Sequence, residues 1–189
     1  MTQLGLFADP QEGPAGLRYT DNFIDTATEQ YLIGRIAALP LQRFQFGAFE
    51  GNRRVAWFGF SYDYTLQRLT EAAPIPDWVR PVAHRVEAWA GLAEGSVRQV
   101  LCTDYDAGVG IGWHRDKPHF DKILGLSLGS PCKFRFRRRS GEKWQRHTLE
   151  AQPRSLYMMD GEARSEWEHS IPPVEARRYS ITFRTMKPM

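Results

Sequence analysis

The second half of the chain consists of short segments in which apolar and polar residues alternate, with no helical pattern between them. Turn signals such as Gly129-Ser130-Pro131 and Ser140-Gly141 separate these segments. Because a parallel sheet needs a crossover between successive strands, this order argues against a βαβ fold. We therefore predict a mainly β protein with flanking helices, arranged as a β-sandwich or jelly roll. The predicted strands cover 98–105, 123–128, 132–138, 145–149, 155–159 and 178–186.

Two helices are expected before these strands. Thr26 and Glu29 form a capping-box pattern, and the apolar residues that follow at helical spacing predict a helix over 26–38. Asp77 is a candidate cap for a second helix, which Gly91 would end. Both helices have one apolar face, so both should pack against a sheet.

The segment between the two helices alternates aromatic residues with small or polar ones and breaks at Gly51-Asn52. This pattern predicts a hairpin with strands over 44–49 and 54–62. The hairpin would stand next to the series of strands that follows it.

A length of 189 residues with 42% hydrophobic and 25% charged side chains suits one globular domain. We expect a mobile tail over 1–16 and one domain over 17–189, in which 17–96 supplies helices and hairpins and the rest forms the jelly-roll core. No apolar stretch is long enough to span a membrane, and no secretion signal is recognisable. A cytoplasmic protein is expected, with Cys102 and Cys132 reduced and buried.

The segment GIGWHRDKP contains a candidate metal-binding pair. His114 and Asp116 stand two residues apart, so in an extended segment both side chains point the same way and can bind one ion. A third neutral nitrogen would complete a set of two histidines and one carboxylate, which leaves positions on Fe(II) open. His169, in WEHSI, is the candidate for that ligand. Taken alone, a His-x-Asp pair is weak evidence, because such a pair more often belongs to a surface turn.

The segment RRYSITFR adds a cationic face. On a strand, Arg178 and Arg184 share one side with Ser180 and Thr182, because side chains alternate along the backbone. Buried arginines would need anions, and a dicarboxylate bound to the metal would supply them. An edge strand with solvated arginines is the alternative.

In this order, HRD, the histidine of WEHSI and RYSITFR resemble the AlkB family of Fe(II)- and 2-oxoglutarate-dependent dioxygenases, which use O2. The similarity extends from about residue 55 to 186 and includes IPDW, SLGS and SLYMMDGEAR. The resemblance implies a double-stranded β-helix, a form of jelly roll. It also implies that His114, Asp116 and His169 hold the iron.

The resemblance assigns the co-substrate site as well. Arg178 would pair with the distal carboxylate of 2-oxoglutarate, Arg184 would lie near its keto-acid end, and Tyr105 would hydrogen-bond to it. Two positions depart from the family, which usually has Asn-x-Tyr where this chain has Thr103-Asp104-Tyr105, and Asn where it has Ser180.

By the same resemblance, the reaction is oxidative dealkylation of N-alkylated bases in DNA or RNA, as in DNA alkylation repair. The base would be single-stranded or flipped out of a duplex, and it would need an aromatic platform. One face of the hairpin offers such a platform, formed by Phe58, Phe60, Tyr62 and Tyr64. The alternative is that these aromatic side chains simply pack in the core. Pro118 stands where repair members often carry an acidic residue.

The segment KFRFRRR alternates cations with phenylalanines. Arg135 and Arg137, together with Lys133 and Arg139, would line one face and contact phosphates, while the phenylalanines anchor the strand. A solvated hairpin edge is the alternative.

Two other functions remain open at this point. One is hydroxylation or demethylation of RNA or protein side chains by the same fold, and the other is a jelly-roll binding module without turnover.

The tail also resembles the pentapeptide that docks bacterial repair proteins on the sliding clamp. Its residues are Gln3, Leu4, Gly5, Leu6 and Phe7.

Overall fold

The computed structural model describes residues 13–188 except 47–48, 64–65 and 67. Its three helices are α1 (Thr26–Ala37), α2 (Arg80–Ala90) and α3 (Gly161–Ser165). Its strands are β1 (Leu17–Thr20), β2 (Gln42–Phe46), β3 (Phe49–Phe58), β4 (Phe60–Asp63), β5 (Arg68–Glu71), β6 (Val97–Tyr105), β7 (Ile111–His114), β8 (Phe120–Leu128), β9 (Cys132–Ser140), β10 (Lys143–Ala151), β11 (Leu156–Met159), β12 (Glu168–Ile171) and β13 (Arg178–Met186).

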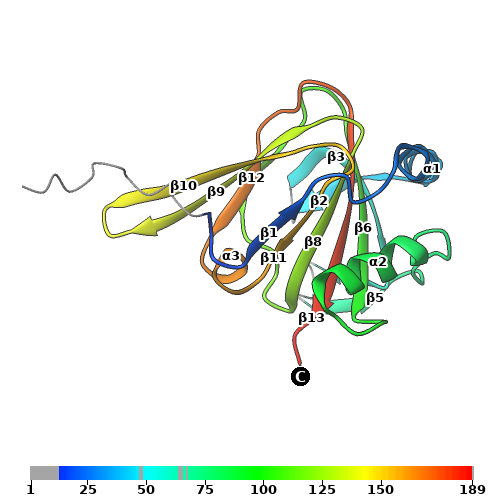
Figure 1. The fold of residues 1–189 in the computed structure, drawn as a ribbon, viewed down its shortest axis with the longest axis horizontal. Helices are drawn as coiled ribbons and strands as arrows, with labels where there is room; N and C mark the ends of the chain where they lie inside the picture. The colour runs from blue at the N-terminus through cyan, green and yellow to red at the C-terminus, as the bar shows by residue number, and fades with distance from the viewer. Residues whose placement is uncertain (1–12, 47–48, 64–65, 67, 189) are drawn as a thin grey trace, which may run out of the picture.

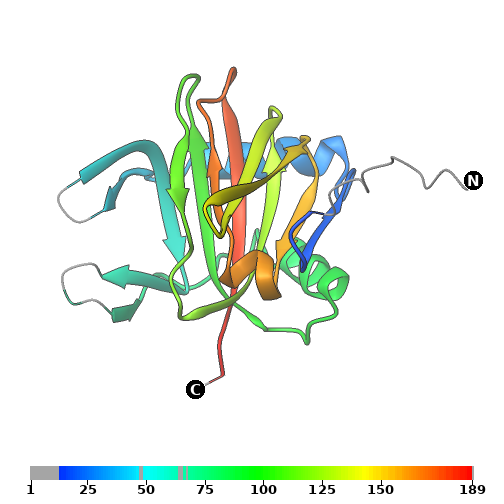
Figure 2. The ribbon, with the colours of Figure 1, turned by 90° about the vertical axis from the view of Figure 1, so that its left-hand side faces the viewer.

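Two sheets form the body of the molecule (Figure 1). The larger has seven strands in the order β1-β11-β8-β13-β6-β3-β2, and the smaller has four in the order β10-β9-β12-β7. Paired strands run antiparallel throughout, and the two sheets lie face to face (Figure 2). The predicted jelly roll is therefore confirmed.

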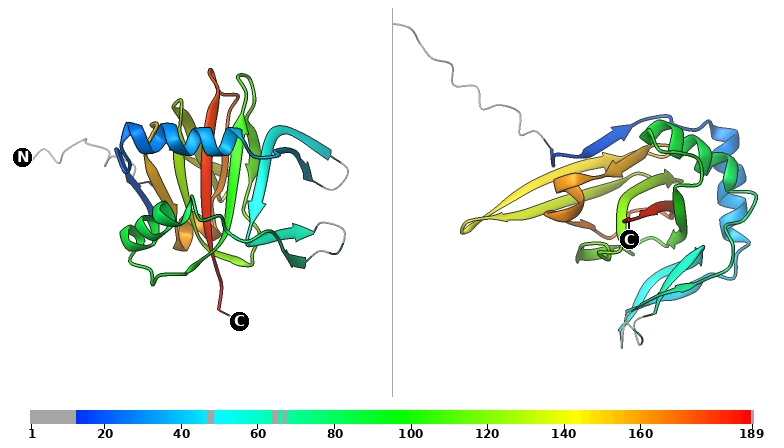
Figure 3. Two further views of the ribbon diagram at one scale, coloured as in Figure 1. Left: turned by 90° about the vertical axis from the view of Figure 1, so that its right-hand side faces the viewer. Right: turned by 90° about the horizontal axis from the view of Figure 1, so that it is seen from below.

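The core has two parts, one on each side of the seven-stranded sheet. Helices α1 and α2 lie across its outer side, as Figure 3 shows, and bury residues such as Leu32, Val86 and Phe183. The second part lies between the two sheets and contains Phe134 and Phe136 of β9. The outer side of the four-stranded sheet carries no helix among the described residues.

Helix α1 matches the predicted span to within one residue, but its cap is different. Asp25 is the N-cap, and its carboxylate accepts a hydrogen bond from the Thr28 amide at 2.8 Å. Glu29, expected to complete a capping box, is instead buried and holds the Gly129 amide at 2.9 Å and Arg154 at 2.9 Å. Glu29 thus fastens the helix to the loop after β8 and to the segment before β11.

Helix α2 begins two residues later than a cap at Asp77 predicts. Its N-cap is Val79, and Pro81 occupies the first turn, where a missing amide hydrogen costs nothing. Gly91 ends the helix in the left-handed conformation, with φ of 71°, as the sequence predicted.

The predicted hairpin strand over 54–62 is divided in the structure. Strand β3 ends at Phe58, and Gly59 turns the chain with φ of 82°. A Cβ at Gly59 would lie 2.1 Å from the Arg98 carbonyl oxygen, so this corner requires glycine. β4 then pairs with β5 in a separate two-stranded sheet.

The chain also makes contacts that the sequence did not predict. Strand β1 pairs with β11. The two residues before β1, which the sequence assigned to the tail, are hydrogen-bonded to the body of the molecule. The Ala15 carbonyl accepts from the Ala163 amide at 2.8 Å, and the Gly16 carbonyl accepts from the Asp160 amide at 3.0 Å.

Both cysteines are free and buried, as expected. No helix in the described residues is long and apolar enough to cross a membrane. The tail pentapeptide, residues 3–7, lies outside the described residues.

Candidate metal centre

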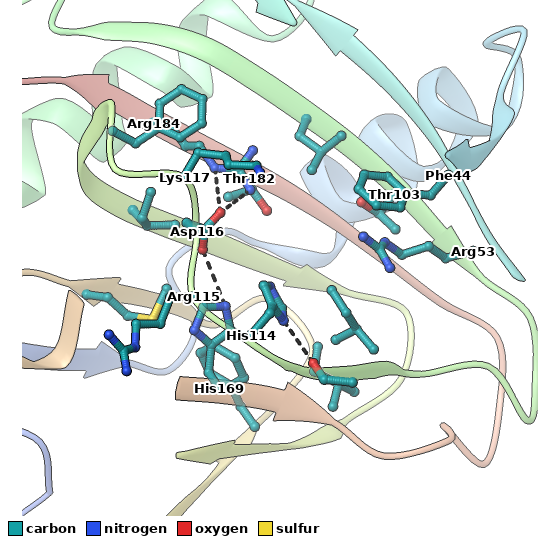
Figure 4. Close-up of a pocket in the computed structure, with 18 of the residues that line it drawn as sticks. Phe44, Arg53, Thr103, His114, Arg115, Asp116, Lys117, His169, Thr182 and Arg184 are labelled. Atoms are coloured by element: carbon teal, nitrogen blue, oxygen red, sulfur yellow. Dashed lines mark hydrogen bonds and ion pairs between the residues drawn. The ribbon is translucent and has the colours of Figure 1, made fainter. Parts of the chain in front are cut away.

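Three candidate ligands meet at the edge of the four-stranded sheet. Strand β7 carries His114 at its end, and the antiparallel register of β12 places His169 directly opposite it. Asp116 follows two residues after His114. One donor atom from each of the three lies within 4.8 Å of the others (Figure 4). Pairing of two short strands thus joins residues that are 55 positions apart in sequence.

His114 is prepared to act as a neutral ligand. The Nδ1 atom of His114 lies 2.8 Å from the Gly112 carbonyl oxygen, which fixes its proton on Nδ1 and leaves Nε2 as the donor. Burial, reinforced by the nearby His169, lowers the pKa of His114 to about 4. Its imidazole is therefore uncharged at neutral pH. The two imidazole rings are 4.3 Å apart, and Phe134 flanks His169 at 5.4 Å.

Asp116 is buried but ionised. Burial alone would raise its pKa, yet the Arg184 guanidinium and the two imidazoles outweigh this effect and hold the pKa well below the usual carboxyl range. Arg184 donates to Asp116 Oδ1 from Nη2 at 2.6 Å and from Nε at 3.0 Å, while its Nη1 donates to Gln99 at 2.8 Å. The other carboxylate oxygen, Oδ2, lies 3.3 Å from His169 Nε2. Arg184 therefore fixes the orientation of the carboxylate.

Arg178, at the other end of β13, is 1% exposed. Its Nε and Nη2 both donate to Ser127 Oγ, at 3.2 and 3.1 Å, and its guanidinium lies 5.1 Å from the centre of the Tyr105 ring. Nη1 is buried without a hydrogen-bond partner in the described part of the chain. A buried cation with a spare donor is costly unless an anion binds it. Ser180 lies next to it on the same face, 6% exposed.

A cavity of about 510 Å³ opens onto these residues. The three candidate ligands, Tyr105 and Arg184 line it. Thr103 and Thr182 also contribute, so one departure from the family pattern, at position 103, lies at the cavity wall. Arg178 and Ser180 are not among the residues that line the cavity. The volume suits a small co-substrate with room for part of a second molecule.

The far side of the cavity comes from the first hairpin, as Figure 4 shows. Phe44 of β2 and Arg53 and Trp57 of β3 line it. The Arg53 guanidinium lies 3.8 Å from the centre of the Phe44 ring, and the Phe44 and Trp57 rings are 6.3 Å apart. The sequence pointed to this hairpin but not to these three residues, although the alternation of β3 already grouped Arg53, Val55 and Trp57 on one face.

Three of the predicted substrate residues, Phe60, Arg135 and Arg137, are not among the residues that line the cavity. Phe60 is on β4, where Arg98 stacks on it at 5.8 Å, and it is not among the residues that line the cavity. Tyr62 is also on β4, and Tyr64 lies outside the described residues. Arg135 and Arg137 are on the outer side of the four-stranded sheet, because the phenylalanines between them point inward.

The donor set fits Fe(II) and an organic dianion. Two imidazoles and one carboxylate on one side of a cavity are the ligand set of non-haem iron enzymes. The spare donor of Arg178 lies beyond the cavity wall formed by Tyr105, where a distal carboxylate would satisfy it.

Comparison with known proteins gives independent information on ancestry. The family model described as the 2OG-Fe(II) oxygenase superfamily matches residues 19–184. The "Alkylated DNA repair protein ALKBH8 homolog" of Arabidopsis thaliana is 31% identical over 184 residues, covering 83% of this chain and 51% of that protein. The human "Alpha-ketoglutarate-dependent dioxygenase alkB homolog 3" is 27% identical over 158 residues, covering 74% and 54% respectively. The chain thus spans about half the length of these two relatives.

Solved structures share the fold. The structure of OsALKBH1 superposes with a TM-score of 0.67 at 15% identity, covering 92% of this chain and 98% of that one. A prolyl-4-hydroxylase of Pseudomonas putida gives a TM-score of 0.61 at 13% identity, covering 92% and 94%. These likenesses concern the backbone only.

Proposed function

Because the chain belongs to the 2OG-Fe(II) oxygenase superfamily and is an AlkB-like dioxygenase, we propose that it removes alkyl groups oxidatively from ring nitrogens of nucleic-acid bases. The family's cofactors are Fe(II), 2-oxoglutarate and O2. DNA is the proposed substrate. The observation that carries the proposal is the cavity itself, which extends from the three ligands to the Phe44, Arg53 and Trp57 side chains.

The ligand side of the cavity would hold the reacting groups. His114, Asp116 and His169 would hold the iron, and Arg184 keeps the Asp116 carboxylate in position. Arg178 would pair with the distal carboxylate of 2-oxoglutarate through its spare Nη1.

When bound, iron with 2-oxoglutarate and O2 supplies the oxidant, and the co-substrate becomes succinate and carbon dioxide. Hydroxylation of an N-methyl carbon gives a product that loses formaldehyde and leaves the unmodified base. Tyr105, which lines the cavity, and Ser180, two residues after Arg178 on β13, are the proposed neighbours of the co-substrate.

The hairpin side of the cavity would hold the base. A flat base stacks well on aromatic rings, and such stacking tolerates different bases. Phe44 and Trp57 offer rings on one side of the cavity, and the imidazole of His114 lines the other. Arg53 brings a positive charge to the place where the phosphates of the bound nucleotide would pass. In this proposal these three hairpin residues replace Phe60, Tyr62 and Tyr64 as the platform.

The alternatives differ in substrate, not in chemistry. A mouse relative is named as a tRNA methyltransferase, which favours RNA as the second candidate. Hydroxylation of a protein side chain is the third candidate. The intact ligand set disfavours a binding module without turnover.

A panel of methylated oligonucleotides tests the proposal directly. Matched DNA and RNA strands carrying N-methylated adenine or cytosine are incubated with Fe(II), 2-oxoglutarate and O2, and each strand is weighed by mass spectrometry. We expect the DNA strands to lose a methylene unit and succinate to appear in equal amount. Demethylation of RNA alone would support the second candidate, and succinate formation without any change in either nucleic acid would refute the proposal.

We also propose that residues 3–7 dock the enzyme on a bacterial sliding clamp. The pattern of Gln3 followed by Leu4, Leu6 and Phe7 is the basis for this proposal. Calorimetric titration of the whole chain with a clamp should show binding that is lost in a variant with Gln3, Leu6 and Phe7 replaced by alanine. Equal binding by both proteins would refute it.

A further inference from the structure

The outer side of the four-stranded sheet carries an array of cations and tryptophans outside the cavity. Cross-strand register puts Trp144 opposite Arg139 and Ser170 opposite Arg135. Trp113 lies on β7, one residue before His114, which is paired with His169. We call the outward-facing set of Arg135, Arg137, Arg139, Trp113 and Trp144 the Arg-Trp ladder.

The ladder is a continuous chain of contacts between guanidinium groups and indole rings. Arg137 lies 4.3 Å from the centre of the Trp113 ring and 4.4 Å from that of the Trp144 ring. Arg135 contacts Trp113 at 5.1 Å, and Arg139 contacts Trp144 at 4.9 Å. All four distances are within the range of favourable cation–π interaction. Each arginine is therefore held in place by an aromatic ring.

Stacking leaves the edges of the guanidinium groups available. A guanidinium contacts a ring with its flat face, while its N–H donors point outward in its own plane. Arg135 donates to the neutral Ser170 hydroxyl at 3.1 Å and Arg139 to the Glu142 carbonyl at 3.2 Å, and neither acceptor cancels their charge. Arg137 is paired with Glu168 at 2.7 Å. The ladder is thus a preorganised row in which Arg135 and Arg139 have no ion-pair partner among the described residues.

The ladder starts at the mouth of the cavity. Trp113 lines the cavity and also contacts Arg135 and Arg137. From there the row follows β9 into the β9–β10 hairpin, which projects from the body on the side opposite α1 and α2 (Figure 1). Lys133 on β9 and Arg146 on β10 face the same way, and Glu150 is opposite Lys133. The path leads from the reacting site to the tip of the hairpin.

We propose that the Arg-Trp ladder binds the phosphate backbone of the single DNA strand whose base occupies the cavity. The inference rests on the proposed function. Charge complementarity argues for this partner, because flat guanidinium groups with free edges match phosphates in a bidentate manner. Residues two apart on a strand are about 6.6 Å apart, which is comparable to the distance between successive phosphates of an extended strand. Arg135, Arg137 and Arg139 would each meet one phosphate.

Binding of oligonucleotides of two lengths tests the ladder. The test variant is Arg135→Gln with Arg139→Gln, which removes two cations but leaves the Arg137–Glu168 pair. The control variant is Arg35→Gln with Arg80→Gln, which removes two exposed helix cations, one of them stacked on Trp78 at 5.6 Å. Fluorescence anisotropy measures the affinity of each protein for a methylated trinucleotide and for a single DNA strand of about 16 nucleotides.

The expected effect follows from counterion release. Each phosphate contact of a single strand contributes about 0.7 to the slope of log affinity against log salt, so two lost contacts lower the slope by about 1.4. The same loss weakens binding of the long strand about 25-fold at about 0.1 M salt. The trinucleotide, which fills the cavity but is too short to follow the hairpin, should lose much less affinity. The control variant should bind the long strand like the unmodified protein.

Other outcomes overturn the inference. An unchanged salt slope in the test variant would show that the ladder is only a solvated face. Equally weakened binding of the long strand by the control variant would mean that affinity depends on net charge and not on the position of the cations. Competition by polyglutamate as effective as that by DNA of equal charge would point to an acidic protein as the partner. Failure of the proposed function has a different signature, because then neither methylated strand loses its methyl group, whatever its affinity.

Discussion

Arg178 provides the sharpest test of the co-substrate site. Its side chain is 1% exposed, and two of its nitrogens share the single Ser127 oxygen, while Nη1 has no partner among the described residues. A distal carboxylate at Nη1 would add at least one charge-assisted hydrogen bond, worth about 1.5–3 kcal/mol. The variant Arg178→Gln should therefore bind 2-oxoglutarate about 10- to 150-fold more weakly.

Calorimetry without oxygen, in the presence of Fe(II), measures this affinity directly. A thermal-shift titration gives a second readout, because a ligand at 100 times its Kd stabilises the folded state by about 2.7 kcal/mol. That stabilisation should shrink in Arg178→Gln at the same 2-oxoglutarate concentration. The matched control is Arg177→Gln, since Arg177 is half exposed and pairs with Asp104 at 2.7 Å. Unchanged affinity in Arg178→Gln, or an equal loss in the control, would refute this assignment.

Three other predictions concern the metal site, packing and pH. His169→Ala should lose stoichiometric Fe(II) binding while remaining folded, as metal analysis and circular dichroism would show; retained iron would exclude it as a ligand. Gly125→Ala should lower the free energy of unfolding by about 1–3 kcal/mol, because the new Cβ would lie 2.1 Å from the Tyr157 ring; denaturation within error of wild type would contradict this. Burial would raise the pKa of Asp160, but the hydrogen bonds from Lys122 and the Gly161 amide outweigh it and lower the pKa. Asp160 therefore stabilises the fold at neutral pH and loses that effect as the pH falls through its folded pKa. The gap in unfolding free energy between wild type and Asp160→Asn should therefore narrow in acid, and a gap independent of pH would argue against it.

The strands that the sequence predicted are those with a local residue pattern of their own. β6, β9 and β13 were expected at nearly their observed bounds, because polar and apolar residues alternate along β9 and β13 and a turn signal follows the short β6 run. β7 and β12 have only four residues each and were not expected. Their strand conformation depends on pairing with distant segments, which no local pattern records.

The same distinction applies to the site. The spacing of His114 and Asp116 is local, so the sequence could place both on one side of an extended segment. The bond between Arg184 and Asp116 depends on how β13 lies relative to the loop after β7. From the sequence only the direction of Arg184 on its own strand could be predicted. Phe44 and Trp57 were missed for a similar reason, because the division of the hairpin at Gly59 decides which aromatics reach the cavity.

Strand β9 connects the metal centre with the outer face of the sheet. Its inward residues Phe134 and Phe136 lie 5.4 and 6.4 Å from the His169 ring, while its outward residues Arg135 and Arg137 stack on Trp113. Because side chains alternate strictly, a shift of β9 by one residue would place arginines against the imidazole and phenylalanines in solvent. The apolar environment of His169 and the cationic outer face therefore depend on one register. A DNA strand bound to the outer face of β9 would stabilise that register. It would also make the inner face of β9, which packs against His169, more rigid without contacting His169 itself.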